Sequence, residues 1–205
     1  MPIPLFLAAA ALSAPLPIEG SLPGTNDYPT EALTKEISAA ALVELVVTPQ
    51  GKVASCKLLA SSGDGKLADA MCGLTKRRKW AAATGPDGLP AYGVVRTLLR
   101  FFIPKTAVGD QIGAMVQSPD VEVTVNHLPV NGAKFYDAKI SLLVDRNGSV
   151  GACEPRIAIA AAQPVLAKFG CEQAKTMHFT VPTIAGEPLS AFVIEQKIRF
   201  LQQTR

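Results

Sequence analysis

Two stretches of the chain alternate apolar and more polar positions with the period of a half-buried β-strand, the first over 42–48 and the second over 139–145. The positions that share the apolar face are Val43, Leu45 and Val47 in the first stretch and Ile140, Leu142 and Val144 in the second. Turn residues follow each stretch, Pro49-Gln50-Gly51 and Arg146-Asn147-Gly148, and a second apolar run begins directly after each turn. The pattern predicts two antiparallel hairpins, with second strands at about 52–59 and 149–157.

A helix and a closing strand are predicted after each hairpin. Leu67, Ala70, Met71 and Leu74 fall at i, i+3, i+4 and i+7, which is one apolar helical stripe. The second helix, about 164–175, has a weaker pattern but starts with a proline. Gly/Pro-rich loops lead from each helix to closing strands at 92–102 and 192–201. The order of hairpin, helix and strand predicts an α+β fold in which each helix packs on one face of a small antiparallel sheet.

Internal similarity suggests that the two units are copies of each other. Residues 46–56 align with 143–153 at a constant offset of 97, and Cys72 aligns with Cys171 at an offset of 99. The Gly-x-Pro at 88–90 and the Arg-Phe at 100–101 recur at 186–188 and 199–200. We expect two tandem small domains, 28–104 and 120–205, joined by a linker at 105–119, with an additional strand at Val121–Val125 in the second.

The four cysteines fit this repeat. Four cysteines allow three pairings, and the equivalent pairing in both units is Cys56 with Cys72 and Cys153 with Cys171. Such bridges would close loops of 16 and 18 residues and each stabilise the fold by roughly 3 kcal/mol. A zinc site is the alternative, but the sequence has no Cys-x-x-Cys pair and neither His127 nor His178 lies at ligand spacing. Disulfides are therefore the better interpretation, and they favour an exported protein.

The first residues have the features of an export signal. The apolar run 3–14 is well below the ~20 residues that span a bilayer, and Ala11 and Ser13 are small residues where a signal peptidase reads. We expect a signal peptide at 1–14, although no basic residue precedes the run and a buried N-terminal helix is the alternative. Spaced prolines predict an extended tether at 15–27. No membrane span is expected once the signal is removed.

Composition and charge remove several classes of function. The chain has 205 residues, 48% of them hydrophobic and 18% charged, which is too apolar for a disordered protein. Net charge is +3, with 10 basic and 8 acidic residues up to Pro104 and 10 and 9 after it, so neither half is a basic nucleic-acid-binding arm. The basic run 76–79 is interpreted as a solvated helix end, and Trp80 and Phe179 as core residues.

Enzyme chemistry has little support in the sequence. No serine lies in Gly-x-Ser-x-Gly, the chain has two histidines, and no pair of carboxylates stands out as an acid/base couple. Gly63-Asp64-Gly65 lacks the Lys-Ser/Thr of a phosphate-binding loop. We therefore expect no catalytic residue, no metal and no cofactor.

The first unit resembles the C-terminal domain of the TonB energy-transducer family. The resemblance covers 28–104 and rests on Tyr28-Pro29, Pro-Gln-Gly-Lys-Val at 49–53, Ser-Ser-Gly at 61–63 and the closing Arg-Phe. The second unit is similar to a diverged member and lacks the Tyr-Pro start. The resemblance implies a periplasmic, non-catalytic protein-binding domain whose partner is a segment of an outer-membrane transporter, bound as an added strand.

The resemblance also implies where a peptide would bind. The matching strand is 92–102, and the expected peptide-binding residues are Tyr28, Pro29, Val94, Arg96, Leu98 and Arg100. Two features depart from a full transducer. The tether would span only about 45 Å at ~3.1 Å per residue, and a second copy could cover the edge of the first. The alternative function is therefore a structural periplasmic protein whose two repeats pack on each other without a free edge.

Overall fold

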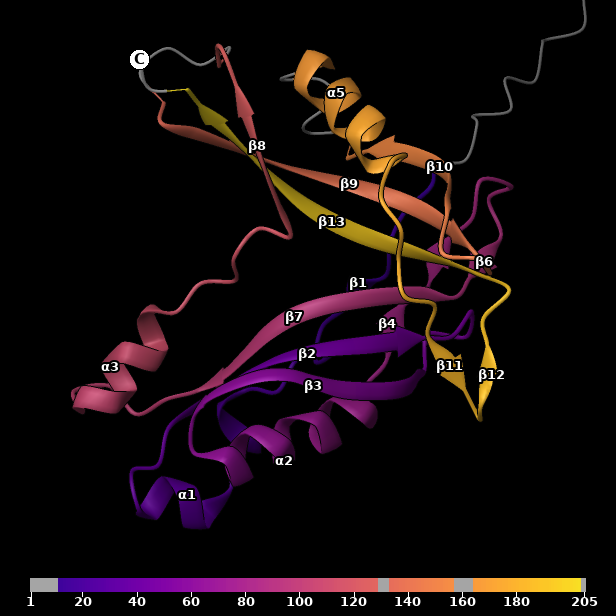
Figure 1. Ribbon diagram of the computed structural model, residues 1–205. Helices are drawn as coiled ribbons and strands as arrows, with labels where there is room; N and C mark the ends of the chain where they lie inside the picture. Colours follow the sequence, from indigo (N-terminus) through magenta and orange to yellow (C-terminus); the bar gives the residue numbers. More distant parts are fainter. Residues whose placement is uncertain (1–10, 129–132, 157–163, 204–205) are drawn as a thin grey trace, which may run out of the picture.

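A seven-stranded sheet runs through the whole molecule in the order β10-β9-β13-β7-β2-β3, with β8 beside part of β13 (Figure 1). The computed structural model describes residues 11–128, 133–156 and 164–203. The sheet strands are β2 (Ala39–Val47), β3 (Val53–Gly63), β7 (Gly93–Phe101), β8 (Val121–Val125), β9 (Phe135–Asp145), β10 (Val150–Pro155) and β13 (Ala191–Gln202). The helices are η1 (Thr25–Asp27), α1 (Thr30–Thr34), α2 (Gly65–Lys76), α3 (Ala107–Ala114) and α5 (Pro164–Ala174). Short strands pair in the loops: β1 (Leu16–Pro17) with β4 (Trp80–Ala81), β5 (Ala83–Thr84) with β6 (Pro90–Ala91), and β11 (Thr183–Ile184) with β12 (Glu187–Pro188).

Both predicted hairpins form, and their turns are built alike. Gly51 and Gly148 have φ of 72° and 83°, a left-handed conformation that favours glycine. The carbonyl of Gly51 accepts a hydrogen bond from the N–H of Trp80 at 2.9 Å, and that of Gly148 accepts one from Phe179 at 2.8 Å. Trp80 and Phe179 are buried, as the sequence predicted. Each turn is therefore tied to the chain that follows the helix of its own unit.

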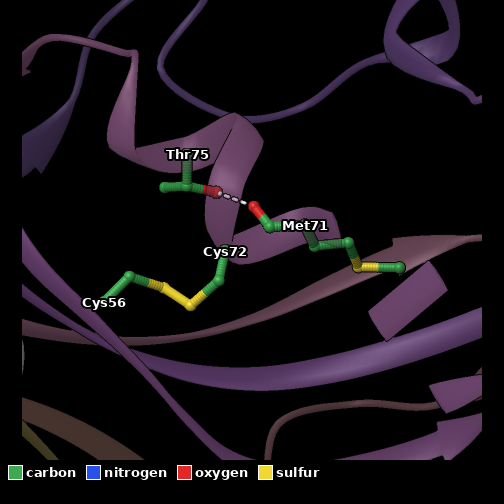
Figure 2. The surroundings of a disulfide bond; sticks show 4 residues. All are labelled: Cys56, Met71, Cys72 and Thr75. Carbon is green, nitrogen blue, oxygen red and sulfur yellow. Dashed lines mark hydrogen bonds between the residues drawn. A yellow bond between two sulfur atoms is a disulfide. The ribbon is translucent and has the colours of Figure 1, made fainter. Parts of the chain in front are cut away.

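The helix of each unit is fixed to its hairpin by a disulfide. In α2, the carboxylate of Asp64 caps the first turn by accepting from the N–H of Leu67 at 2.8 Å. Figure 2 shows the bridge between Cys56 and Cys72 beside the hydrogen bond from the Thr75 hydroxyl to the Met71 carbonyl. The second bridge joins Cys153 of β10 to Cys171 of α5. The Cα–Cα separations are 5.7 and 5.6 Å, so the two units are closed in the same way.

The two units join through their closing strands. β7 and β13 run parallel and pair at Gly93 with Val193 and at Val94 with Ile194. Val94 and Ile194 lie in the hydrophobic core under α5, whereas Val95 of β7 packs in the core under α2. Because successive strand residues point to opposite faces, α2 and α5 cover opposite faces of one continuous sheet, as Figure 1 shows.

Two segments that the sequence assigned to connections have structure of their own. The expected linker 105–119 contains α3, whose first turn is capped by Thr106 accepting from the N–H of Gly109 at 3.0 Å. In the expected tether 15–27, Leu16 and Pro17 pair with Ala81 and Trp80. The prolines leave this segment extended, and an extended segment can add to a short strand as well as cross solvent.

Most of the expected signal peptide lies outside the described residues, which begin at Ala11. Its last part does not project from the molecule, because Leu12 and Ala14 are buried against the sheet. Among the helices within the described ranges, none has both the length and the apolar character to cross a membrane.

β3 and β10 form the two ends of the sheet order, and both are irregular. The pairing of β2 with β3 shifts register between Leu42 and Val43 and again between Val46 and Val47. The pairing of β9 with β10 shifts between Val150 and Ala152, and β10 ends at Pro155. The outer strands therefore carry bulges, whereas β2 with β7 and β9 with β13 pair in unbroken register.

Candidate peptide-binding edge

The outer side of β7, away from β2, is the surface on which the sequence predicted a peptide site. The carbonyl of Tyr92 accepts from the N–H of Val193 at 2.9 Å, and that of Arg96 accepts from the Gln117 amide at 3.1 Å. Backbone groups of alternate strand residues point to the same side. Val94, Arg96, Leu98 and Arg100 therefore direct their N–H and C=O groups away from β2.

This edge is partly occupied by the second unit. β13 pairs with β7 at Gly93 and Val94, and further along it pairs instead with β8, from Ile198 with Val121 to Gln202 with Val125. The two closing strands diverge between these regions (Figure 1). Within the described residues, β7 from Val95 to Phe101 has β2 on one side and no strand on the other.

The last residues of α3 and the non-strand segment that follows them lie along the open part of the edge. Besides the Gln117 bond to Arg96, the guanidinium of Arg100 donates to the carbonyls of Gly113 at 2.7 Å and Met115 at 2.6 Å. Val116, between these contacts, is 81% exposed. The edge cover, residues 113–117, is thus held to β7 by side-chain hydrogen bonds and not by a backbone ladder.

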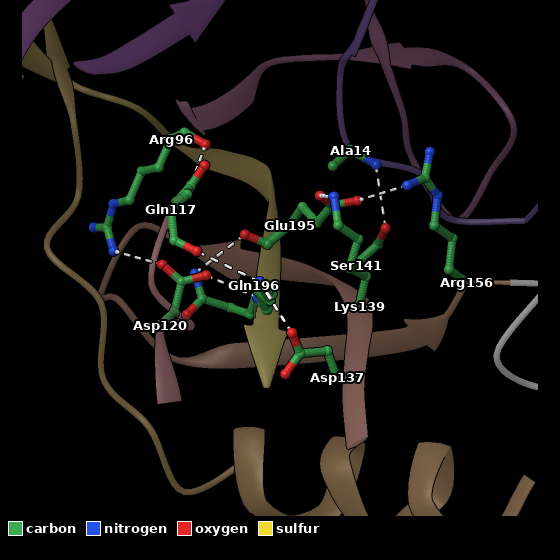
Figure 3. Close-up of polar contacts among 11 residues, drawn as sticks. Ala14, Arg96, Gln117, Asp120, Asp137, Lys139, Ser141, Arg156, Glu195 and Gln196 are labelled. Carbon is green, nitrogen blue, oxygen red and sulfur yellow. Dashed lines mark hydrogen bonds and ion pairs between the residues drawn. The ribbon is translucent and has the colours of Figure 1, made fainter. Parts of the chain in front are cut away.

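Charged residues fill the wedge between β7 and β13 (Figure 3). Arg96 lies 2.9 Å from Glu44 of β2 and 4.0 Å from Asp120. The carboxylate of Asp120 accepts from the N–H of Lys197 at 2.7 Å, and its own N–H donates to the Lys197 carbonyl at 2.8 Å. Asp120 therefore links β7 electrostatically to the backbone of β13 at the point where the strands separate.

Burial raises the pKa of Asp120 above its ordinary value. The hydrogen bond from Lys197 and the charge of Arg96 act in the opposite direction, and Glu195 adds to the rise. Loss of water around a carboxylate disfavours its charged form, and here that effect is the largest.

The wedge continues into ion pairs on β9 and β13. Glu195 lies 2.6 Å from Lys139 and 3.5 Å from Arg156, and Asp137 accepts two bonds from Arg199 at 2.7 and 3.0 Å. Arg199, followed by other nearby groups such as Lys197, lowers the pKa of Asp137 against the opposing effect of burial. The wedge contains a cavity of about 270 Å³ whose charged lining is Arg96, Asp120, Lys139, Arg156, Glu195 and Lys197.

Tyr28 and Pro29 lie at the far end of β7 from the junction. The Tyr28 hydroxyl donates to the carbonyl of Ile37 at 2.6 Å, and its ring centroid is 4.8 Å from that of Phe101. Burial raises the pKa of Tyr28. Pro29 is the N-cap residue of α1, where its carbonyl accepts from Leu33 at 2.9 Å. In this structure both residues fix the chain before β2.

The six residues expected at a peptide site thus fall into three groups. Arg96, Leu98 and Arg100 share the open part of the β7 edge, whereas Val94 is 1% exposed and pairs with Ile194. Tyr28 and Pro29 lie beside the Phe101 end of the same strand. Sequence reasoning did not find Gln117 and Asp120, whose positions follow from the path of the chain between the units and have no local motif.

The described ranges contain no cluster of three or more His, Cys, Asp or Glu side chains that could hold a metal ion. All four cysteines are in the two disulfides. Paired cysteines in a chain of this kind are typical of proteins exported to an oxidising compartment.

Comparison with known protein families gives a match over part of the chain. Residues 25–97 match the family model described as Gram-negative bacterial TonB protein C-terminal. The matched region begins at η1, includes α1, β2, β3 and α2, and ends in the middle of β7. No curated protein and no solved structure matches the chain.

Proposed function

We propose that this chain, whose residues 25–97 match the TonB C-terminal domain, is a periplasmic protein-binding module that holds an extended segment of a partner on the outer edge of β7. The family implies a partner among the TonB-dependent outer-membrane transporters, and the proposed role is in that transport. TonB C-terminal domains are protein-interaction modules without catalysis, and we propose the same for this chain.

The open edge of β7 is the observation that carries the proposal. Arg96, Leu98 and Arg100 present backbone groups on a side where the described residues place no strand. An extended peptide can satisfy such groups with its own backbone, while pockets for its side chains give specificity. A small cavity of about 240 Å³ beside this edge is lined by Thr97, Leu98 and Arg100 and by residues 115–117.

The edge cover would have to yield to a bound segment. It is attached to β7 by the amide of Gln117 and the guanidinium of Arg100, and these side chains can rotate without unfolding the sheet. A cover of this kind protects an edge strand from uncontrolled pairing.

A structural role is the second candidate, and the junction favours it. β7 and β13 pair at Gly93 and Val94, so the second unit already uses one end of the edge. If the edge cover never leaves, the outer side of β7 would stay blocked, and the two units would form one sheet without a binding role at this edge. The two functions differ in whether the amides of Leu98 and Arg100 become protected when a peptide is added.

The test is a titration of the ¹⁵N-labelled chain with synthetic N-terminal segments of TonB-dependent transporters, followed by amide hydrogen exchange. We expect saturable binding with a Kd in the micromolar range and slowed exchange at Arg96, Leu98 and Arg100. Absence of binding at about 1 mM peptide would favour the structural role, and protection confined to β3 or β10 would contradict a site on the β7 edge.

Two substitutions at one position supply the control. Leu98→Pro removes the outward N–H, a change that edge strands tolerate when that group faces away from the sheet. Leu98→Ala removes the side chain and keeps the N–H. We expect Leu98→Pro to weaken binding at least tenfold and Leu98→Ala to change it less than about threefold, with near-UV circular dichroism confirming that both variants are folded.

A further inference from the structure

An extended segment at the start of the described chain crosses the junction between the two units. Ser13 exchanges backbone hydrogen bonds with Thr84 in both directions, at 2.9 and 3.1 Å, and Leu16 and Pro17 pair with Ala81 and Trp80. These bonds attach the segment to the first unit. We call residues 11–17 the strap.

The strap is also bonded to the second unit. The N–H of Ala14 donates to the hydroxyl of Ser141 on β9 at 3.2 Å, as Figure 3 shows. Ser141 is 7% exposed, so its hydroxyl is a buried polar group directed at the strap backbone. One short segment therefore makes hydrogen bonds to both units.

The side chains of the strap fill a groove lined by both units. Leu12 and Ala14 are 6% and 4% exposed and form one hydrophobic cluster with Ala83 and Val193. Leu143 and Ala152 pack against the same cluster. The side chains that Leu12 and Ala14 meet in this groove are therefore apolar ones from both units.

Gly93 leaves the space that Pro15 of the strap occupies at the centre of the groove. A Cβ at Gly93 would collide with the ring of Pro15 and approach the Cβ of Ala83 to 2.9 Å. Gly93 is also the residue of β7 that pairs with Val193 of β13. The strap therefore lies directly over the residue pairs that join the two closing strands.

The strap has the geometry of a bound peptide. It is extended and joined on both sides by backbone or hydroxyl hydrogen bonds, with alternate side chains buried at Leu12 and Ala14. It leaves the groove through a turn at Ile18–Ser21 whose residues Ile18, Glu19 and Gly20 are exposed. A cavity of about 490 Å³ continues beside it, lined by Glu154, Pro155 and Arg156.

We propose that the groove over the junction is a binding site for an extended apolar peptide with the pattern leucine, small, small, proline, and that the strap is its resident ligand. This site is on a face of the sheet and differs from the β7 edge. It requires that residues 11–14, which the sequence analysis assigned to the signal peptide, remain part of the folded protein. Occupation of the groove holds the two units together, because its ligand bonds to both.

The experiment separates the strap from the rest of the full chain. A specific protease sequence is inserted between Glu19 and Gly20, and the purified protein is cut there. Native mass spectrometry should show the N-terminal fragment still bound. A fluorescent peptide of residues 11–18 should then exchange into the cut protein, to one peptide per chain, and should not bind uncut protein.

Changes in the peptide provide controls that leave the protein's fold untouched. Leu12→Asp in the peptide should reduce binding at least tenfold, because it places a carboxylate in the apolar cluster. Ile18→Asp should change binding less than threefold, since Ile18 is 47% exposed. Loss of the sheet signal in circular dichroism after cutting, dissociation of the fragment without rebinding of peptide, or equal binding of both variant peptides would overturn the proposal.

Discussion

At the scale of single residues, the two units repeat the same solution at their hairpin turns. Gly51 and Gly148 both take positive φ, and a Cβ at either position would collide with a backbone carbonyl, that of Trp80 or that of Phe179. Any other residue would therefore meet both backbone strain and a steric clash.

We expect Gly51→Ala and Gly148→Ala each to lower the free energy of unfolding by about 1–3 kcal/mol. Gly73→Ala on α2 is the matched control. A Cβ there meets no neighbouring atom, and alanine favours a helix by up to about 1 kcal/mol. Urea denaturation measures all three. An effect at only one of the two turns would argue against equivalent roles.

Two aspartates at the wedge should give opposite dependences of stability on pH. The pKa of Asp137 is lowered in the folded protein, so its stabilising contribution is present above its ordinary value of about 3.9 and is lost as pH falls below it. The pKa of Asp120 is raised, so its ionisation costs stability as pH rises above that ordinary value.

Accordingly, Asp137→Asn should destabilise the protein by less than about 1 kcal/mol at neutral pH, and this difference from wild type should shrink below pH ~4. Asp120→Asn should instead compare more favourably with wild type at neutral pH than at pH ~4. Urea denaturation across pH 3–7 gives both curves. Parallel curves for the two variants would contradict the assignment of opposite shifts.

At the scale of elements, two features border the outer side of β7. One is the short parallel pairing with β13, and the other is the edge cover, which is held by side-chain hydrogen bonds. Asp120 fixes the chain to β13 three residues after the cover, and the cover begins in the last turn of α3. The cover is thus held at both ends, by α3 and by the bonds of Asp120 to β13, and its contacts to β7 are side-chain hydrogen bonds.

Removing one contact should make the edge more accessible. We expect Gln117→Ala to speed amide exchange across residues 113–117 and to increase the affinity for an edge-binding peptide by about two- to tenfold, since a hydrogen bond of this kind contributes ~0.5–1.5 kcal/mol. Val116→Ala is the control, because Val116 is 81% exposed. Weaker binding by Gln117→Ala would mean that the cover is part of the site.

The sequence predicted elements well where the signal was local. Alternating apolar residues and turn glycines indicated the hairpins, and the internal repeat indicated the pairings Cys56–Cys72 and Cys153–Cys171. The α+β class is confirmed. α3 was missed although Thr106 caps it, because only Val108 and Ile112 mark an apolar spacing in a helix of eight residues.

What the sequence did not reveal depends on contacts between distant segments. The parallel pairing of Gly93 with Val193 and the hydrogen bond from Ala14 to Ser141 join residues separated by 100 or more positions. The local sequence around Gly93 or Ala14 does not indicate which distant residue it contacts. The same applies to the edge of β7, where the family resemblance pointed to Arg96, Leu98 and Arg100 but no local pattern predicted the cover that lies over them.

At the scale of the whole molecule, the two units share one sheet, and each contributes apolar side chains to a core that contains residues of the other. Val46 and Val94 of the first unit lie in the core of the second, together with Ile184 from its β11–β12 hairpin. Ala83 of the first unit packs on Val193 of the second. Separation of the units would expose apolar surface on both.

We therefore expect a single cooperative unfolding transition, with equal calorimetric and van't Hoff enthalpies. Val193→Asp, at the junction, should lower the one melting temperature of the whole molecule, because a buried carboxylate there has no partner. Leu59→Asp is the control, at a position 39% exposed. Two resolved transitions in wild type would show that the units are energetically independent.

The bulged outer strands have a consequence for solubility at high concentration. A sheet of this length could in principle stack end to end with other copies through β3 and β10 and so form fibrils. The register shifts in both strands and Pro155 at the end of β10 interrupt the regular spacing of free backbone groups that such growth requires. The two ends of the sheet are thus built to resist self-assembly, which is compatible with the proposed binding of a partner at the β7 edge.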